Sequence, residues 1–278
     1  MSPHHLAPTL ASAIAVAVLG ALAAPARAQH CHIDTPPRPT GAAAAPAVAI
    51  TVGTRVTAGV ARVPALTTPM MIERDYQGAD LVVDVTWRRV TAEARLGAFR
   101  VADHGVGLDD LAAARAVRLT PRGAAIAVSA LGGATLPTGD ADAGRGMGHV
   151  MVAAGVAARA HRGRYAADAT VTYARALGDG AAHAAHAHGA ELWPLIDPMG
   201  AEEVTVELGG AVAVGPRGLA VRASGLFGQP IAHGARRLIT TGGVTYGRGR
   251  YQVGAALSVP AVSDAFITRG QLSLAYHY

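Results

Sequence analysis

The chain has 278 residues, 51% of them apolar and 15% charged, and its formal net charge of +5 rests on arginine alone because the sequence contains no lysine. The arginines occur singly or in pairs beside expected turns, without the clustering on one aromatic-rich surface that nucleic-acid binding requires, so a nucleic-acid partner is not expected. After residue 28 no apolar run reaches the roughly 18 residues of a membrane-spanning helix, which excludes helical spans.

The N-terminal segment has the pattern of an export signal. In residues 1–28 an apolar stretch, "ASAIAVAVLGALAA", precedes the small-residue sequence "ARA" before Gln29, as in a secretory signal peptide. That stretch is shorter than the roughly twenty residues of a membrane anchor. Residues 29–46 are rich in Pro and Ala and are predicted to form a flexible periplasmic leader. The single cysteine, Cys31, cannot form an internal disulfide, so stability must come from packing or from the environment.

From residue 47 onward short turns and longer connections alternate. Four of the short turns contain Arg with Gly or Pro, which supply the dihedral angles of tight hairpins, and the fifth is a tighter reversal at two arginines. They are expected at residues 88–89, 120–123, 161–164, 215–218 and 247–250. The longer connections are expected at residues 64–78, 103–109, 137–148, 178–201, 230–235 and 260–268. This alternation is typical of an up-and-down barrel whose turns share one rim and whose loops share the other.

Between these connections lie twelve predicted strands. They are residues 47–63, 79–87, 90–102, 110–119, 124–136, 149–160, 165–177, 202–214, 219–229, 236–246, 251–259 and 271–278. Their even number is that of bacterial single-chain barrels. Residues 47–278 are therefore predicted to form an all-β, up-and-down antiparallel transmembrane β-barrel.

The alternation of side chains gives each strand an apolar and a polar face. In residues 79–87, Leu81, Val83 and Val85 alternate with Asp84 and Thr86. A soluble β-sandwich would alternate in the same way, with the apolar face turned to a core. Aromatic residues favour the membrane, because an aromatic girdle is expected at the barrel rim. Tyrosines at the predicted turn-side rim are Tyr165, Tyr251, Tyr276 and Tyr278.

The C-terminal segment "QLSLAYHY", residues 271–278, is predicted to be the closing strand, paired with residues 47–63. Its apolar face needs no protein core if outer-membrane lipid is the partner. An alternating apolar strand that ends on an aromatic residue is also what the bacterial barrel-assembly machinery handles, so this machinery is a second expected partner.

Two segments resemble a known family. Residues 107–140, "GLDDLAAARAVRLTPRGAAIAVSALGGATLPTGD", resemble the "GLGDL" to "LPTGD" region of the outer-membrane channels linked to the meta-pathway of phenol degradation. Asp109 stands where that family has Gly. Residues 144–180, beginning "GRGMGHVMVAAG", resemble its following hairpin. The resemblance implies a barrel similar to the transporters of hydrophobic compounds, and hence uptake or efflux of an unspecified substrate.

Charged residues of both signs are predicted to face the lumen. They are Asp84, Arg88, Glu93, Arg95, Asp168, Glu207 and Arg222. One interpretation is a pore lining that selects solutes by charge and width. The alternative is a polar plug, because opposite charges can pair across the narrow interior of a twelve-stranded barrel and fill it.

Histidines suggest a second possible function. His183, His186 and His188 lie close together in the longest predicted loop. A second cluster, His30, Cys31 and His32, follows the expected cleavage site. Imidazole and thiolate groups are ligands for Zn and Cu, so a closed surface barrel that binds transition metal is the alternative function. A solvated, Ala-rich loop explains the same histidines without metal, and no other cofactor is expected.

No catalytic site is expected. Ser224, Ser258 and Ser273 are predicted to face inward, as is His277, so no Ser–His pair falls on adjacent lipid-facing positions. The sequence therefore favours a non-enzymatic protein of the bacterial outer membrane that acts as a channel or transporter for small solutes, with hydrophobic compounds among the candidates.

Overall fold

The computed structural model describes residues 48–64, 71–103, 105–140, 146–177, 202–215, 218–231, 236–262 and 266–278. The predicted signal peptide, the leader and the loop at residues 178–201 lie outside these ranges. Within the described ranges, no helix has the length and apolar character needed to cross a bilayer.

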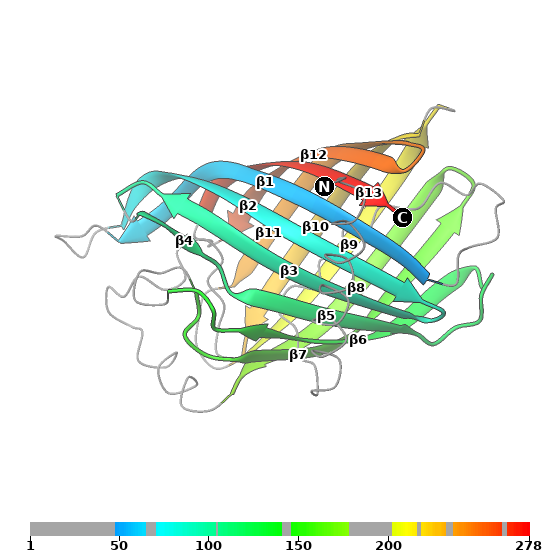
Figure 1. Ribbon diagram of the computed structural model, residues 1–278, viewed down its shortest axis with the longest axis horizontal. Coiled ribbons are helices and arrows are strands. Elements are labelled where there is room, and N and C mark those ends of the chain that lie inside the picture. The colour runs from blue at the N-terminus through cyan, green and yellow to red at the C-terminus, as the bar shows by residue number, and fades with distance from the viewer. Residues whose placement is uncertain are drawn as a thin grey trace, which may run out of the picture.

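The strands form one antiparallel sheet that closes on itself (Figure 1). They are β1 (Val48–Pro64), β2 (Met71–Trp87), β3 (Val90–Val101), β4 (Gly105–Leu108), β5 (Leu111–Arg118), β6 (Ile126–Leu136), β7 (Met151–Arg162), β8 (Tyr165–Ala176), β9 (Glu202–Val214), β10 (Leu219–Pro230), β11 (Arg237–Arg248), β12 (Tyr251–Val262) and β13 (Phe266–His277). Each strand pairs with its neighbours in sequence, except that β4 and β5 both pair with β3, and β1 also pairs with β13. The predicted pairing of the first and last strands is confirmed.

The fourth strand of the barrel is interrupted. Both β4 and β5 pair with β3, and the break between them falls at Asp109 and Asp110. Because β4 and β5 are two parts of one barrel strand, the predicted closed antiparallel barrel of twelve strands is confirmed.

Two predicted boundaries are wrong by several residues. The second strand begins at Met71, and its ladder with β1 runs without interruption from Val48↔Trp87 to Pro64↔Met71. The predicted connection over residues 64–78 is therefore mostly strand. The outward side of this extension carries exposed polar residues such as Glu73 and Asp75, so apolar alternation does not indicate a strand there. The last strand likewise begins at Phe266, five residues before the predicted start at residue 271.

The barrel has two different ends. We call the end where β2 meets β3 and β11 meets β12 the turn end, and the opposite end the loop end. The start of β1 and the end of β13 both lie at the turn end. In two of the short turns, Gly163 and Gly249 have φ angles of 61° and 63°, a conformation that favours glycine.

The outer face of the barrel is apolar and has aromatic residues at the turn end. Trp87, Tyr165, Tyr251 and Tyr278 are all more than half exposed there. The Tyr276 ring lies edge-on to both Tyr251, at a centroid distance of 5.0 Å, and Tyr278, at 4.6 Å. The predicted tyrosines thus gather at one rim, as in an aromatic girdle.

Candidate functional site

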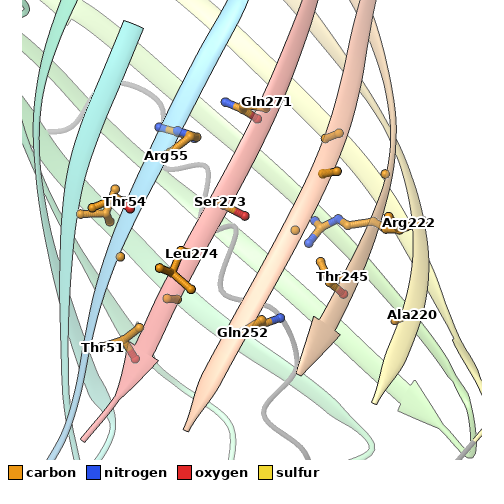
Figure 2. Close-up of a pocket in the computed structure, with 18 of the residues that line it drawn as sticks. Thr51, Thr54, Arg55, Ala220, Arg222, Thr245, Gln252, Gln271, Ser273 and Leu274 are labelled. Carbon is orange, nitrogen blue, oxygen red and sulfur yellow. The ribbon is translucent and has the colours of Figure 1, made fainter. Parts of the chain in front are cut away.

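The turn-end half of the barrel contains a cavity lined by charged and neutral polar side chains together with small apolar ones (Figure 2). Its volume is about 190 Å³. Inward positions of β1, β2, β3 and of β9 to β13 line it, including Arg55, Asp84, Glu93, Arg222 and His277. The hydroxyl of Thr51 lies 2.9 Å from Nδ1 of His277 on this lining. The cavity wall therefore combines charged groups of both signs with neutral hydrogen-bonding groups.

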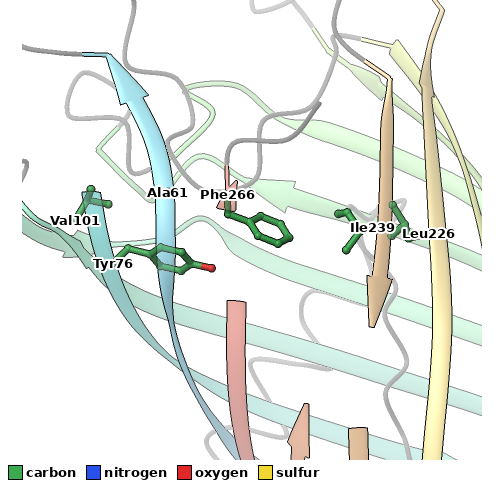
Figure 3. Close-up of a cluster of buried hydrophobic side chains, with 6 residues drawn as sticks. All are labelled: Ala61, Tyr76, Val101, Leu226, Ile239 and Phe266. Carbon is green, nitrogen blue, oxygen red and sulfur yellow. The ribbon is translucent and has the colours of Figure 1, made fainter. Parts of the chain in front are cut away.

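An apolar layer lies inside the barrel on the loop side of this cavity (Figure 3). Its buried members are Ala61, Tyr76, Val101, Leu226, Ile239 and Phe266. The Phe266 ring projects from β13 toward Ile239 and Leu226, which come from β11 and β10. Phe266 is 1% exposed, and the guanidinium of Arg269 lies 4.3 Å from its ring centroid. The layer thus joins side chains from β1, β2, β3, β10, β11 and β13 inside the barrel.

A β-bulge turns Phe266 into this layer. Thr268 pairs with Val60 on β1, but Phe266 pairs with the next residue, Ala61, so that Ile267 is an extra residue in β13. Such an extra residue changes which side chains face inward. If the strand had no bulge, simple alternation from the inward Arg269 would place Ile267 inside and Phe266 outside.

Beyond the apolar layer, toward the loop end, lies a buried ion pair. The guanidinium of Arg237 on β11 donates to the carboxylate of Glu203 on β9, and the two side chains are 3% and 1% exposed. The pair passes over Gly228 on the intervening β10, where a Cβ atom would lie 2.8 Å from Oε1 of Glu203 and 3.1 Å from Nε of Arg237. Glycine at position 228 therefore allows the two charged groups to meet.

A similar arrangement holds Asp168 and Arg222 at the cavity. Nη2 of Arg222 on β10 lies 3.2 Å from Oδ2 of Asp168 on β8. A Cβ atom at Gly209, on the intervening β9, would lie 2.5 Å from that same oxygen. Here too a glycine on the middle strand gives the pair room to lie along the wall.

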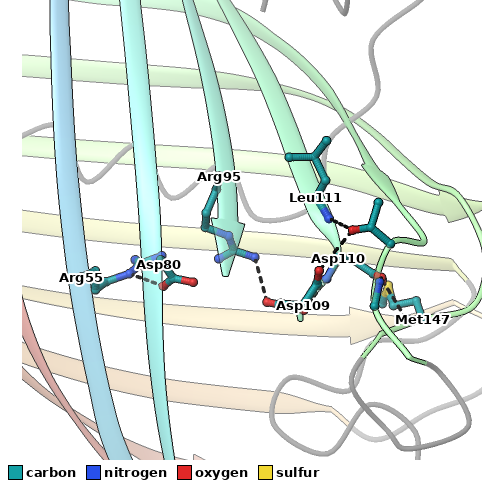
Figure 4. A network of polar contacts seen from close by, with 9 residues as sticks. Arg55, Asp80, Arg95, Asp109, Asp110, Leu111 and Met147 are labelled. Atoms are coloured by element: carbon teal, nitrogen blue, oxygen red, sulfur yellow. Dashed lines mark hydrogen bonds and ion pairs between the residues drawn. The ribbon is translucent and has the colours of Figure 1, made fainter. Parts of the chain in front are cut away.

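Two further ion pairs join adjacent parts of the wall (Figure 4). Nε of Arg55 on β1 donates to Asp80 on β2 over 2.9 Å, and Arg95 on β3 lies 3.9 Å from the carboxylate of Asp109. All four of these lumen pairs connect strands that are adjacent or separated by a single strand. They run along the wall and do not connect opposite sides of the barrel, which favours the pore-lining interpretation over a plug made by these groups.

The break between β4 and β5 holds a loop in place at the loop end (Figure 4). The buried carboxylate of Asp110 accepts hydrogen bonds from the backbone N–H groups of Gly139, at 2.9 Å, and Met147, at 2.7 Å. The Thr138 hydroxyl accepts from the Leu111 N–H over 2.8 Å and donates to the carbonyl of Asp109. These contacts bring together the "GLDDL", "LPTGD" and "GRGMG" segments quoted above.

The structure places six of the seven predicted lumen residues on the inner face. Asp84, Glu93 and Arg222 line the cavity. Arg95 and Asp168 form the ion pairs described above, and Glu207 occupies the inward position two residues from Thr205, on the same face as Glu203. Their part in selecting solutes stays a prediction.

Arg88 differs from the prediction. It lies in the turn between β2 and β3 with a positive φ of 53°, and its guanidinium is 4.9 Å from the centroid of the outward Trp87 ring. The strand ends at Trp87, as predicted, and Arg88 belongs to the turn, where the alternation that would have turned it inward no longer applies.

The predicted metal ligands cannot be placed. His30, Cys31, His32, His183, His186 and His188 all lie outside the described residues. Within the described ranges, no group of three or more His, Cys, Asp or Glu side chains is arranged to hold a metal ion.

Several lumen residues were not anticipated from the sequence. Phe266 fell in a predicted loop, and Arg237 and Glu203 were included in strands without a role. The signal that could have identified Glu203 is "AEEV", where the second of two acidic residues falls on the same face of the strand as Thr205 and Glu207. The glycines beneath the ion pairs carry no comparable signal, because the sequence contains 34 glycines.

No family model and no curated protein matches the sequence. Among solved structures, the fold is similar to an outer membrane channel from Pseudomonas putida F1, with a TM-score of 0.60 and 15% identity over 87% of this chain and 100% of that chain. It is also similar to the translocator domain of the autotransporter NalP from Neisseria meningitidis, with a TM-score of 0.50 and 12% identity over 84% of this chain and 90% of that chain. At these identities the similarity establishes the fold, a closed antiparallel barrel of the outer-membrane type.

Proposed function

We propose that the protein is an outer-membrane channel that passes small solutes with apolar surface. The observation that carries this proposal is the turn-end cavity, whose wall includes charged and hydroxyl groups, bounded on its loop side by the apolar layer around Phe266. A solute that moves along the lumen must leave the polar wall and pass apolar side chains, which favours molecules that lose little free energy when they shed water.

The ion pairs along the wall support a passage rather than a filled interior. Asp168 and Arg222 lie over Gly209, and Arg55 pairs with the adjacent Asp80, so these long side chains stay close to the backbone. Charged groups held in this way present a polar surface to a solute and select it by charge and width.

The proposed location is the outer membrane of a Gram-negative bacterium, reached through the predicted signal peptide. An apolar outer face with aromatic residues at one rim is typical of barrels that contact lipid. Short turns of such barrels lie on the periplasmic side, so we assign the turn end to the periplasm and the loop end to the exterior. The similarity to an outer membrane channel supports this assignment.

The proposed substrate class is small hydrophobic compounds, including aromatic ones. The resemblance of residues 107–140 and 144–180 to channels linked to phenol degradation supports this choice. The apolar layer supports it independently, because a solute that moves along the lumen must pass its buried aromatic and aliphatic side chains. No catalytic step is part of the proposal.

Single-channel recording in planar bilayers tests the proposed function. We expect discrete channel events, and we expect phenol to block the current reversibly at lower concentrations than glycerol, a polar solute of similar size. Equal block by both solutes would contradict selection by the apolar layer. Absence of events from both the natural chain and a Phe266→Ala variant would contradict a channel altogether.

A further inference from the structure

Arginines gather where two neighbouring turns of the barrel meet at the turn end. Arg88 and Arg89 form the turn between β2 and β3, and Arg122 lies in the connection between β5 and β6. The two turns are joined, because the backbone N–H of Arg118 donates to the carbonyl of Arg89 over 2.7 Å. The exposed guanidinium groups of both turns therefore face the same region outside the barrel.

A fourth arginine lies on the outward face beside them. Arg115 on β5 is exposed and pairs in register with Ala92 on β3 and Gly132 on β6. Val117, the next outward residue of β5 toward the turn end, pairs with Val90, the first residue of β3. Arg115 is therefore two residues from the turn-end edge of this ladder. A charge facing hydrocarbon is costly at mid-membrane and much less so near the interface. A long arginine side chain can extend toward the interface. We therefore group the charge of Arg115 with those of the turns.

We call Arg88, Arg89, Arg115 and Arg122 the basic patch. Within the described parts of the chain, none of the four forms an ion pair with a carboxylate, in contrast to the lumen arginines. The contacts that they do make are with neutral groups: Arg88 lies over the Trp87 ring, and Arg122 approaches the carbonyl of Arg88 at 3.5 Å. Four positive charges thus share one surface without an internal counter-charge.

Exposed apolar side chains border the basic patch on the barrel wall. Trp87, directly before Arg88, is 51% exposed. Ile126, the first residue of β6 after the connection that contains Arg122, is 55% exposed. A partner that satisfies both surfaces must combine an anionic group with a hydrocarbon part. Free phosphate lacks the hydrocarbon, and an acidic protein surface would leave the apolar side chains in water.

We propose that the basic patch binds the phosphate group of an anionic phospholipid in the leaflet at the turn end. The guanidinium groups pair with the phosphate, since arginine is suited to phosphate geometry. The acyl chains lie against the apolar wall beside Trp87, whose ring occupies the interfacial level where tryptophan is enriched. The site lies on the outer surface and is independent of what passes through the lumen.

Trp87 itself reports on this lipid. The chain contains two tryptophans, Trp87 and Trp193, so a Trp193→Phe variant leaves Trp87 as the single indole fluorophore. This variant is reconstituted in phosphatidylcholine bilayers with increasing fractions of brominated phosphatidylglycerol, or of brominated phosphatidylcholine for comparison. Bromine quenches tryptophan on contact, so the extent of quenching gives the relative occupancy of each lipid beside Trp87. We expect a preference for the anionic lipid of about threefold or more.

Replacing Arg88, Arg89 and Arg122 by Gln in the same background should abolish the preference, and Arg122→Gln alone should reduce it. Arg100→Gln is the matched control, because Arg100 is an exposed outward arginine at the other end of β3, and it should leave the preference unchanged. Heat-modifiable gel mobility verifies that each variant forms the barrel. Equal quenching by the two lipids in the Trp193→Phe protein would overturn the proposal, as would loss of the preference in the Arg100 control.

Discussion

Glu203 and Arg237 pair inside the barrel across a strand to which neither belongs, over the single hydrogen atom that Gly228 presents in place of a side chain. Because both groups are buried, each charge needs the other as its counter-charge. An unpaired buried charge costs far more than the loss of a surface ion pair.

Removing one partner should therefore destabilise the barrel more than removing both. We expect Glu203→Gln or Arg237→Met alone to lower the free energy of unfolding by about 3 to 5 kcal/mol, and the double variant to recover part of this loss. Urea unfolding in lipid vesicles, followed by gel mobility, measures the difference. If the loss of unfolding free energy in the double variant equals the sum of the two single losses, the two groups do not interact.

Phe266 should limit the width of the lumen. Phe266→Ala removes an aromatic ring that is 1% exposed, so we expect a larger single-channel conductance together with a loss of stability of about 3 to 5 kcal/mol. Phe227→Ala is the matched control, because Phe227 on β10 is 40% exposed and faces outward. Its removal should leave the conductance unchanged. Similar conductance changes in both variants would mean that the effect arises from general loosening of the barrel.

The charged groups of the cavity should set ion selectivity. Asp84→Asn removes a negative charge from the cavity wall and should shift the reversal potential in a KCl gradient toward anion preference, whereas Arg222→Gln should shift it toward cation preference. The two variants control for each other, since a general structural effect would not change sign. Shifts in the same direction would contradict the placement of these two charges along the conducting path.

Asp110 should hold the loop between β6 and β7. Asp110→Asn weakens the hydrogen bonds from Gly139 and Met147, each to a charged acceptor, and we expect a cost of about 1 to 3 kcal/mol. Limited proteolysis should then cleave the chain between these two residues more rapidly. Asp103→Asn is the control, because Asp103 is exposed and pairs with Arg74 at the surface, where such pairs contribute little. Equal proteolysis of both variants would contradict the proposed role of Asp110.

The barrel itself could be predicted because its pattern is local. Alternation such as that of Leu81, Val83 and Val85, together with glycine and arginine at the turns, depends only on neighbours along the chain. The same alternation places Asp84, Glu93 and Arg222 on the inner face, where the structure also has them.

The contents of the lumen could not be predicted to the same extent, because they depend on residues that are distant in sequence. Glu203 and Arg237 meet only because Gly228 on the strand between them leaves room, and a glycine with this role looks like any other in a glycine-rich chain. Arg88 was misplaced for a local reason: it lies in the turn itself, with a positive φ, so the alternation of the strand does not fix its direction and its side chain lies over Trp87.

At the bulge around Ile267, the hydrophobicity of a residue and the side of the strand that it faces are set independently. The hydrophobicity of Phe266 suits lipid and lumen equally well, so composition does not decide which of the two it contacts; the bulge between it and Arg269 does. If β13 ran through Ile267 without the bulge, Ile267 would face inward and the Phe266 ring would turn to the outer face; deletion of Ile267, in contrast, would leave Phe266 next to Thr268 on an inward position. The apolar layer of this barrel thus depends on the backbone path of one strand at one residue, a feature that the apolar composition of that strand leaves open.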